Sequence, residues 1–572
     1  MMKLPNLSAA MAAPLTALAL LSACSEEPAA PSGEATISAE ALSANIRTLA
    51  SDEFGGRAPA SEGEELTVAF MTKAFRGLGL EPANGDSYSQ PVPLVSIEAG
   101  QDTKLSVKAG GATIDLAYGT SQVTWTRQVI DSIAVSDSEM VFVGYGINAP
   151  ERGWNDYDGI DVTGKTVVML INDPGYATQD PALFNGNAMT YYGRWDYKFD
   201  EAAAQGAAGA IIIHDTQPAA YPWSTVENSW TGPQFSLVRP DGGAALAKFE
   251  AWISNDSARL MMSAAGQDLD ALMEAAKTPG FRAVPLSLTA SSALTNKTSR
   301  INSRNVAAIL PGKSRPDEVF IYMAHWDHLG TKMNAAEGED AIYNGALDNA
   351  TGTAGLIELA RAYTSLPERP DRSVMFLAVT AEEQGLLGSA WYASNPLVPL
   401  ASTVGGINMD GLNNFGPTRD VTVVGLGNSE LDKYLEGALR EGRRLRPDAF
   451  PEKGYFYRSD HFELAREGVP MLYPGSGIDH KEKGEAYGIE REKDYTGKHY
   501  HGPSDEWSPD WDLSGAVEDL QLYFRTGLAL VNSNDWPNWS EGTEFKAKRD
   551  AQRQSAVQPE ADPQPQPTEK SE

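Results

Sequence analysis

Strand-like apolar runs alternate with segments of helical spacing over the second half of the chain. The runs "NVAAILPG", "EVFIYMA", "SVMFLAV" and "TVGGINM" are rich in β-branched and bulky residues, and "TGTAGLIELARAYTSL" has the apolar spacing of a helix. This alternation predicts an α/β fold with a mostly parallel, mixed central sheet that is covered by helices on both faces. Functional groups on such sheets gather at the carboxyl ends of the strands, so the candidate chemistry is expected there.

The first half of the chain shows a different pattern. The stretch "ISAEALSANIRTLASDEFGGR" predicts a helix that ends in a Gly-rich break at Gly55 and Gly56, and helical spacing resumes after it. From about residue 129 to residue 285, strands such as "GKTVVMLIND" adjoin the helix-and-strand unit "FDEAAAQGAAGAIIIHD", and no convergent set of catalytic residue types is present. We therefore predict a separate domain at 129–285, inserted into a main domain of residues 38–128 and 286–540.

The two ends of the chain have the composition of segments that do not join a core. Residues 1–23 carry a lysine near the start and an apolar stretch too short to span a bilayer as a lasting helix, which predicts a signal peptide. Residues 24–37 are small, polar and Pro-containing, as expected of a tether. Residues 541–572 are rich in Pro, Gln and Glu and are predicted to be disordered.

The end of the predicted signal peptide, Leu21-Ser22-Ala23-Cys24, resembles a bacterial lipobox. The resemblance implies cleavage before Cys24, acylation of its thiol, and a lipid-anchored protein on the periplasmic side of the bacterial cell envelope. Ser25, in place of Asp after the cysteine, favours the outer membrane. The alternative is a cleaved secretory signal followed by an incidental cysteine.

Charge and cysteine content narrow the possible chemistry. The formal net charge of -31 and the pI of about 4.6 disfavour nucleic acid as a partner, because such a surface repels phosphate backbones. Cys24 is the only cysteine, so neither an intramolecular disulfide nor a thiolate zinc site is possible. Any catalytic chemistry must therefore use His, Asp, Glu or hydroxyl groups.

Residues able to bind a metal ion or move a proton follow three predicted strands and occupy two loops. They are His325 and Asp327 after "EVFIYMA", Glu382 and Glu383 after "SVMFLAV", Asp410 after "TVGGINM", Asp348 in "GALDNATGTAG" and His501 in "KHYHGPSDEW". Imidazoles with carboxylates suit Zn²⁺, and one carboxylate can bridge two ions about 3.5–4 Å apart around a shared hydroxide. Each residue alone is more often a turn, cap or surface residue. Their coincidence, with six of the seven histidines between residues 325 and 501, favours a metal site.

These motifs resemble the family of co-catalytic zinc exopeptidases that includes bacterial leucyl aminopeptidases and plasma glutamate carboxypeptidase. The resemblance extends from "IRTLASDEFGGR" to "YHGPSDEW", and the segment "GYGINAPERGWNDYDGIDVTGKTVVML" resembles the protease-associated domain of several members. It implies the three-layer zinc-exopeptidase fold and two zinc ions. It also implies an inserted β-rich protease-associated domain that forms a lid or wall at the site.

The family pattern implies a role for each of the seven residues. The ligands of one zinc would be His325, Asp348 and Asp410, and those of the other Asp348, Glu383 and His501. Asp348 would then bridge the two ions. Glu382 matches the general base, and Asp327 matches the carboxylate that orients the ligand histidine. The last role also follows from the strand: residues two apart share a face, so Asp327 can accept the second ring N–H of His325.

The run "YFYRSDHFELAREGVP" also matches the family and contains the candidates for substrate binding. These are Arg458, Asp460, and Tyr457 as a hydrogen-bond donor to the tetrahedral oxyanion. His461 is not expected to be a ligand, because both ligand sets are already complete. The remaining candidates, His214, His328 and His499, are interpreted as structural or supporting residues.

The leading functional interpretation is a metal-dependent aminopeptidase that hydrolyses N-terminal residues of peptides with a zinc-bridging hydroxide and Glu382 as general base. A carboxypeptidase or dipeptidase on the same di-zinc core stays open, because Arg458 can bind a terminal carboxylate. Glutaminyl cyclase-like chemistry, which uses one zinc in related folds, is disfavoured by the presence of both Asp348 and His501. A non-catalytic peptide-binding surface lipoprotein would be expected to have lost the base or a ligand. The sequence indicates no protein partner.

The lipobox resemblance generates a direct test. The wild-type chain, expressed in bacteria with a labelled fatty acid, should carry the label and fractionate with the envelope. Cys24→Ser should carry no label, because acylation requires the thiol. A wild-type protein without label would contradict the predicted anchor.

Overall fold

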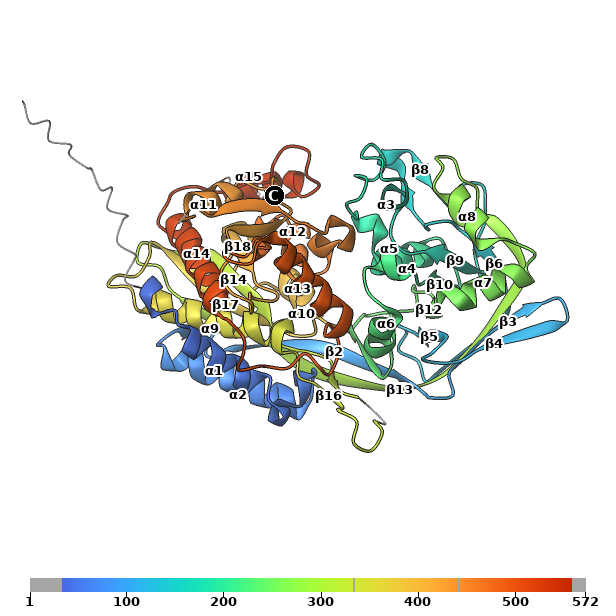
Figure 1. The fold of residues 1–572 in the computed structure, drawn as a ribbon, viewed down its shortest axis with the longest axis horizontal. Coiled ribbons are helices and arrows are strands. Elements are labelled where there is room, and N and C mark those ends of the chain that lie inside the picture. The colour runs from blue at the N-terminus through green and yellow to red at the C-terminus, as the bar shows by residue number, and fades with distance from the viewer. Residues whose placement is uncertain (1–32, 333–334, 441, 558–572) are drawn as a thin grey trace, which may run out of the picture.

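The computed structural model describes residues 33–332, 335–440 and 442–557 (Figure 1). The predicted signal peptide, Cys24 and most of the predicted tether lie outside the described residues. Two sheets, each with its own helices, lie next to one another and share the long strand β13 (Val284–Leu310), as Figure 1 shows. In the described part of the chain, no helix combines the length and the apolar composition needed to cross a bilayer.

The main sheet has four neighbouring parallel strands at its centre. In spatial order these are β17 (Arg372–Val379), β14 (Arg315–His325), β18 (Thr403–Asn408) and β21 (Met471–Ser476). Antiparallel pairing extends the sheet on both sides. Next to β17 lie β13 and β2 (Ser89–Ala99), and next to β21 lie β19 (Asp420–Val424) and β20 (Arg444–Pro447), the last parallel to β19. The predicted mostly parallel, mixed sheet is confirmed.

Successive residues of the central strands face two layers of helices. In β14, Phe320 and Tyr322 pack into one apolar cluster, and Ile321 and Met323 pack into another on the opposite face. The first face is covered by α1 (Ala39–Leu49), α2 (Glu62–Gly77), α9 (Thr351–Thr364), α11 (Leu431–Gly437) and α14 (Ser514–Val531), and the second by α10 (Leu387–Ser394) and α12 (His461–Arg466). Every residue of β17 is buried, which is the pattern of a strand covered on both faces.

The second sheet forms a domain with its own apolar clusters. Its strands are β3 (Lys104–Ala109), β4 (Ala112–Leu116), β5 (Gln122–Trp125), β6 (Ser132–Phe142), β9 (Thr166–Leu170), β10 (Gly209–Ile213), β12 (Phe249–Ile253) and the first part of β13. Its helices are α3 (Pro174–Thr178), α4 (Trp195–Ala204), α5 (Thr216–Ala219), α6 (Trp223–Trp230), α7 (Asn255–Ala264) and α8 (Leu269–Ala276). We call residues 104–283 the second domain.

The second domain begins earlier than the boundary predicted at residue 129. β3, β4 and β5 already pair with strands of the second sheet. The sequence gives little sign of the change, because only four residues separate the end of β2 from the start of β3 and both segments have strand patterns. One strand of the second domain, β11 (Pro233–Leu237), pairs with β2 and so belongs to the main sheet.

Two terminal segments are folded where the sequence predicts a tether or disorder. Glu34, in the predicted tether, is buried and forms an ion pair with Arg525. The helix α15 (Lys546–Val557) lies in the tail predicted to be disordered, and its buried Arg549 donates a hydrogen bond from Nη2 to the carbonyl of Thr403. The helix is anchored by an arginine and has few apolar residues, so its composition resembles that of a disordered segment. Residues 558–572 lie outside the described part.

The Gly-rich break between α1 and α2 places an arginine under the loops of the main sheet. Gly55 and Gly56 both have positive φ, at 53° and 68°. They turn the chain so that the guanidinium of Arg57 is buried and donates hydrogen bonds to the carbonyls of Leu49, Trp326, Asn344 and Gly345. One side chain therefore binds four carbonyl groups that lie in three segments of the chain.

The two glycines of this break make a matched pair for a stability experiment. A Cβ at Gly56 would collide with the carbonyl oxygens of Gly330 and Tyr343, whereas a Cβ at Gly55 would meet open space. Gly55→Ala should cost only the positive-φ penalty of about 1–2 kcal/mol. Gly56→Ala should cost a further ~1–3 kcal/mol from overpacking. Thermal unfolding midpoints of the two variants would check this order, and equal midpoints would contradict it.

Candidate metal centre

The central parallel strands end beside one another, and the predicted site residues follow directly. β14 ends at His325, which is paired with Val379 at the end of β17, and β18 runs parallel on the other side of β14. Glu382 and Glu383 follow β17 after a short turn, and Asp410 follows β18. The register of the sheet thus brings side chains from three distant segments to one edge.

One group of converging donor atoms contains His325, Asp348 and Asp410. Nε2 of His325 lies 3.3 Å from Oδ1 of Asp348 and 3.2 Å from Oδ1 of Asp410. Asp348 is in an irregular turn at the start of α9, where its N–H donates a hydrogen bond to Asp505. These contacts bring together the three residues of the first predicted ligand set.

A second group shares Asp348 with the first. Nε2 of His501 lies 3.5 Å from Oδ2 of Asp348 and 2.8 Å from Oε2 of Glu383. Asp348 therefore turns one carboxylate oxygen toward His325 and the other toward His501. This is the orientation that a carboxylate needs in order to bridge two ions.

The other histidines differ in their distance from these groups. His328 is buried, and its Nδ1 contacts Oε1 of Glu383, so it supports the second group and is close enough to serve as a donor itself. His499 is partly exposed and contacts Ser504. His214 is buried in the second domain, where its Nε2 lies 3.0 Å from the carbonyl oxygen of Tyr221.

Asp327 links His325 to Glu382, in a way that differs from the predicted contact. Nδ1 of His325 lies 3.2 Å from the main-chain oxygen of Asp327 and 3.8 Å from its Oδ1. The carboxylate instead accepts a hydrogen bond from the main-chain N–H of Glu382, at 3.1 Å. Strand geometry placed the residue on the correct side but did not show that its own carbonyl would be nearer to the ring.

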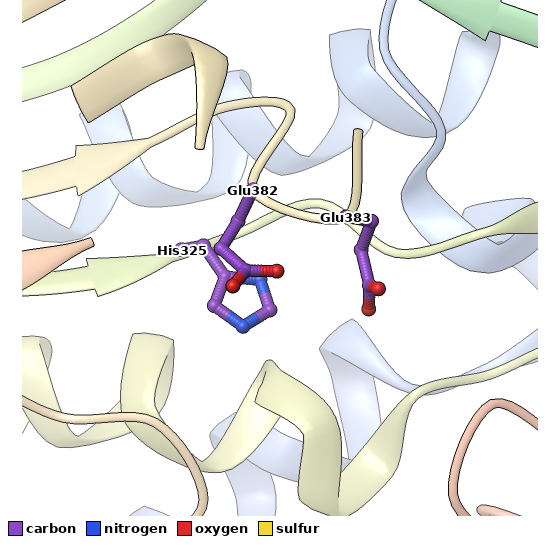
Figure 2. Close-up of side chains that lie close together, drawn as sticks. All are labelled: His325, Glu382 and Glu383. Atoms are coloured by element: carbon purple, nitrogen blue, oxygen red, sulfur yellow. The ribbon is translucent and has the colours of Figure 1, made fainter. Parts of the chain in front are cut away.

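The adjacent Glu382 and Glu383 lie in different electrostatic environments. Burial, together with the carboxylates of Asp410 and Glu383, raises the pKa of Glu382 well above its usual range. Burial also acts to raise the pKa of Glu383, but the neighbouring His501 and His328 together outweigh it and lower the pKa of that carboxyl below its usual value. Figure 2 shows the carboxylate of Glu382 in front of the His325 ring, while Glu383 extends separately. One side chain is suited to hold a proton and the other to face a cation.

The donor set fits divalent metal ions. Each group contains one imidazole nitrogen and carboxylate oxygens from two residues, the donors that Zn²⁺ accepts in the absence of thiolates. The buried carboxylates also require compensating positive charge, and they raise the pKa of His501 to about 10 even though burial opposes this. The chemistry of the site therefore favours cations between these side chains.

Two cavities adjoin the donor groups. The larger, of about 870 Å³, is lined by Asp348, Glu382 and Asp410 on the side of the main sheet. The smaller, of about 100 Å³, lies between Glu383 and the second domain, whose Trp125, Arg194 and Trp230 contribute to its wall. The second domain therefore closes one side of the site.

The residues predicted to bind substrate differ in whether they line these cavities. Arg458 lines both of them. Tyr457 lines neither and packs instead against Tyr191, Phe456 and Phe462. The motif gave no orientation for Tyr457, because the short turn at residues 455–457 decides which of its rings faces the cavity.

Asp460 also lies away from both cavities. It is fully buried, and the hydroxyl of Ser389 donates a hydrogen bond to its Oδ1. Its neighbour Ser459 donates a hydrogen bond to Oδ2 of Asp410 and accepts one from Asn408. Ser459 therefore supports Asp410, and neither Ser459 nor Asp460 lines a cavity.

None of the tyrosines that line the larger cavity was predicted from the sequence, and two of them are Tyr473 and Tyr500. The ring of Tyr500 stacks on that of His501 with centroids 4.0 Å apart, and its hydroxyl accepts a hydrogen bond from Arg458. Its position next to His501 in the sequence was an available signal. Tyr473 lies in β21, and the residues directly before and after it do not line the cavity.

The fold and the donor set define a protein with a candidate two-metal centre at the carboxyl edge of an α/β sheet. Residues 305–525, which include the main sheet from the end of β13 to α14, match the model described as "Peptidase family M28". The likeness to that family thus covers the part of the chain that carries the candidate metal centre.

Individual relatives match over shorter segments. A "Probable zinc metalloprotease" from Pyricularia oryzae is 37% identical over 106 residues, which are 18% of this chain and 20% of the relative. "Aminopeptidase NAALADL1" from Rattus norvegicus is 36% identical over 114 residues, 19% of this chain and 14% of the relative. The chain thus spans a fifth or less of the length of these relatives.

A solved structure matches over most of the chain. The "Aminopeptidase from Aneurinibacillus sp. strain AM-1" has a TM-score of 0.51 and 18% identity, and the match covers 89% of this chain and 96% of the other. At this identity the likeness establishes the fold.

Proposed function

We propose that this chain is a two-zinc aminopeptidase that removes N-terminal residues from peptides. The observation that carries the proposal is the orientation of Asp348, with one carboxylate oxygen toward each of two donor groups, beside the carboxylate of Glu382. The match to a peptidase family over residues 305–525 and the names of the relatives support the same reading.

Each side chain at the site has a separate task in this reaction. Zinc ions, when bound, polarise the scissile carbonyl and acidify a water molecule. Glu382 accepts the proton of the attacking water and delivers it to the leaving amine. Asp327 holds the main chain of Glu382 in place through the 3.1 Å hydrogen bond to its N–H. Tyr473 and Tyr500 line the same cavity, and a tyrosine hydroxyl there can donate a hydrogen bond to the developing oxyanion.

The charge of the larger cavity favours a substrate with a free amino terminus. Beyond the metal-binding carboxylates, its lining includes Asp448, Glu492 and Asp494, and acidic side chains outnumber basic ones in it. A protonated amine is attracted to such a surface, whereas a terminal carboxylate is repelled.

Carboxypeptidase action is the second candidate, and one observation favours it. The guanidinium of Arg458 lines both cavities, and Tyr500 next to it presents a hydroxyl. A guanidinium can bind a terminal carboxylate through two parallel hydrogen bonds. The two candidates differ in which end of the peptide must be free.

Blocking each end of one peptide separates the two candidates. N-acetylation should abolish cleavage, because the acidic cavity then has no amine to bind, and C-terminal amidation should be tolerated. The unblocked peptide is the control. Loss of cleavage on amidation alone would move the function to a carboxypeptidase, and Arg458→Met should then raise KM for the unblocked peptide.

Exchanging the two adjacent glutamates for glutamine tests their separate tasks. Glu382→Gln should keep about two zinc ions per chain but lower kcat by roughly 10²–10⁴-fold, because glutamine cannot accept the proton. Glu383→Gln should lose metal from one group, because a neutral amide is a poor ligand, and added zinc should restore part of the activity. Metal content and kcat are measured together. Metal loss in Glu382→Gln with retention in Glu383→Gln would reverse the assignments.

The proposed site of action is the cell envelope, with the chain held to the membrane by an acylated Cys24. This part of the proposal rests on the lipobox resemblance of Leu21-Ser22-Ala23-Cys24. Peptides outside the cytoplasm would then be the substrates. The labelling experiment on Cys24→Ser tests it independently of catalysis.

A further inference from the structure

The second domain contacts the ligand histidine His501 directly. Two consecutive residues at the end of α6 make the contact. The hydroxyl oxygen of Ser229 lies 2.9 Å from Nδ1 of His501, and Nδ2 of Asn228 donates a hydrogen bond of 3.1 Å to the carbonyl oxygen of His501. Ser229 is buried, and the ring's other nitrogen, Nε2, faces Asp348 and Glu383.

These two contacts control both the ring and the main chain of His501. A histidine that binds a metal through Nε2 carries its proton on Nδ1, and the partner of Nδ1 fixes the plane of the ring. Here that partner is the oxygen of Ser229. The main chain of His501 has a φ of 54°, in the left-handed region that residues other than glycine rarely adopt. The hydrogen bond from Asn228 holds the carbonyl group of that residue.

The two ligand histidines are therefore supported differently. Nδ1 of His325 contacts the carbonyl of Asp327, two residues along its own strand end. Nδ1 of His501 contacts a residue of another domain, 272 positions away in sequence. The group of His325, Asp348 and Asp410 is complete within the main domain, and the group around His501 is not.

The end of α6 is itself held rigidly. Trp230 packs against Trp125, Trp195 and Trp252 in the second domain. Gln234, at the start of β11, donates a hydrogen bond to the carbonyl of Ser229, and β11 then pairs with β2 of the main sheet. Contacts from both domains thus hold Ser229 beside His501.

We propose that the second domain completes the metal group of Asp348, Glu383 and His501, with Ser229 as a positioning residue for His501 and Asn228 as a support for its main chain. The proposal rests on the metal centre of the proposed function. It assigns the second domain a part in metal binding in addition to forming a wall of the cavity. Loss of the Ser229 hydroxyl should weaken one metal group and leave the other unchanged.

The test is metal titration of chains first stripped of metal. Co²⁺ is added in competition with a chelator, and binding is followed by its absorption spectrum. The wild type should show two binding steps. In Ser229→Ala one step should weaken by about 10–100-fold, the usual effect of removing the partner of a ligand histidine. Ser224→Ala is the matched control, because Ser224 is an exposed serine of the same helix.

Two further variants identify the weakened step. Glu383→Gln removes a ligand of the group around His501, and Asp410→Asn removes a ligand of the group around His325. The step that weakens in Ser229→Ala should be the one lost in Glu383→Gln and retained in Asp410→Asn. Asn228→Ala should weaken the same step, and the thermal unfolding midpoints of the metal-free variants should match that of the wild type.

The outcomes distinguish this proposal from the proposed function. Two unchanged steps in Ser229→Ala, or two steps weakened equally, would overturn the role of the second domain and leave the two-metal centre intact. A wild-type chain that shows no binding step would overturn both.

Discussion

Asp348 presents its two carboxylate oxygens to two different histidines, and the arrangement of the site depends on this one side chain. A buried carboxylate is unstable unless cations or hydrogen-bond donors surround it. Segments far apart in sequence supply that environment: the end of β14 provides His325, and the loop after α13 (Glu485–Lys498) provides His501. The carboxylate of Asp505 accepts hydrogen bonds from the main-chain N–H groups of Leu347 and Asp348 and so fixes the turn itself. A shift of the turn that carries Asp348 alters both donor groups together, because only Asp348 belongs to both.

Buried polar contacts hold the segments that converge on this carboxylate. Arg57 ties four carbonyl groups beneath the loops, and Ser459 connects Asn408 to Asp410. Apolar packing fixes the sheet and its helices, but it tolerates small shifts of side chains. Hydrogen bonds with defined directions restrict those shifts, and a metal site requires its ligands within a few tenths of an ångström. Apolar packing therefore fixes the sheet and its helices, and directed hydrogen bonds fix the segments that carry the candidate ligands.

The sequence predicts the features that depend on local pattern. The apolar runs located the central strands, and polar residues directly after them located His325, Glu382, Glu383 and Asp410, because parallel strands end at one edge. Features set by distant contacts were not predictable in the same way. Tyr473 faces the cavity, Ser229 reaches the site from another domain, and α15 is anchored by a buried arginine. No periodic pattern in the sequence indicates such contacts between residues far apart in the chain. The prediction for Tyr457 rests on the motif alone, and the orientation of its side chain depends on a turn that the motif does not encode.

The shared strand β13 has a mechanical consequence. Its first part pairs with β3 and β6 of the second sheet, and its later part pairs with β2 and then β17 of the main sheet. A domain that opened like a hinged cover would have to bend β13 where its two ladders meet, between Thr295 and Asn296, and to strain the pairing of β11 with β2. The shared strand and this pairing therefore resist opening of the second domain. With such a junction, a substrate would enter by movement of side chains and loops, and Ser229 would stay beside His501.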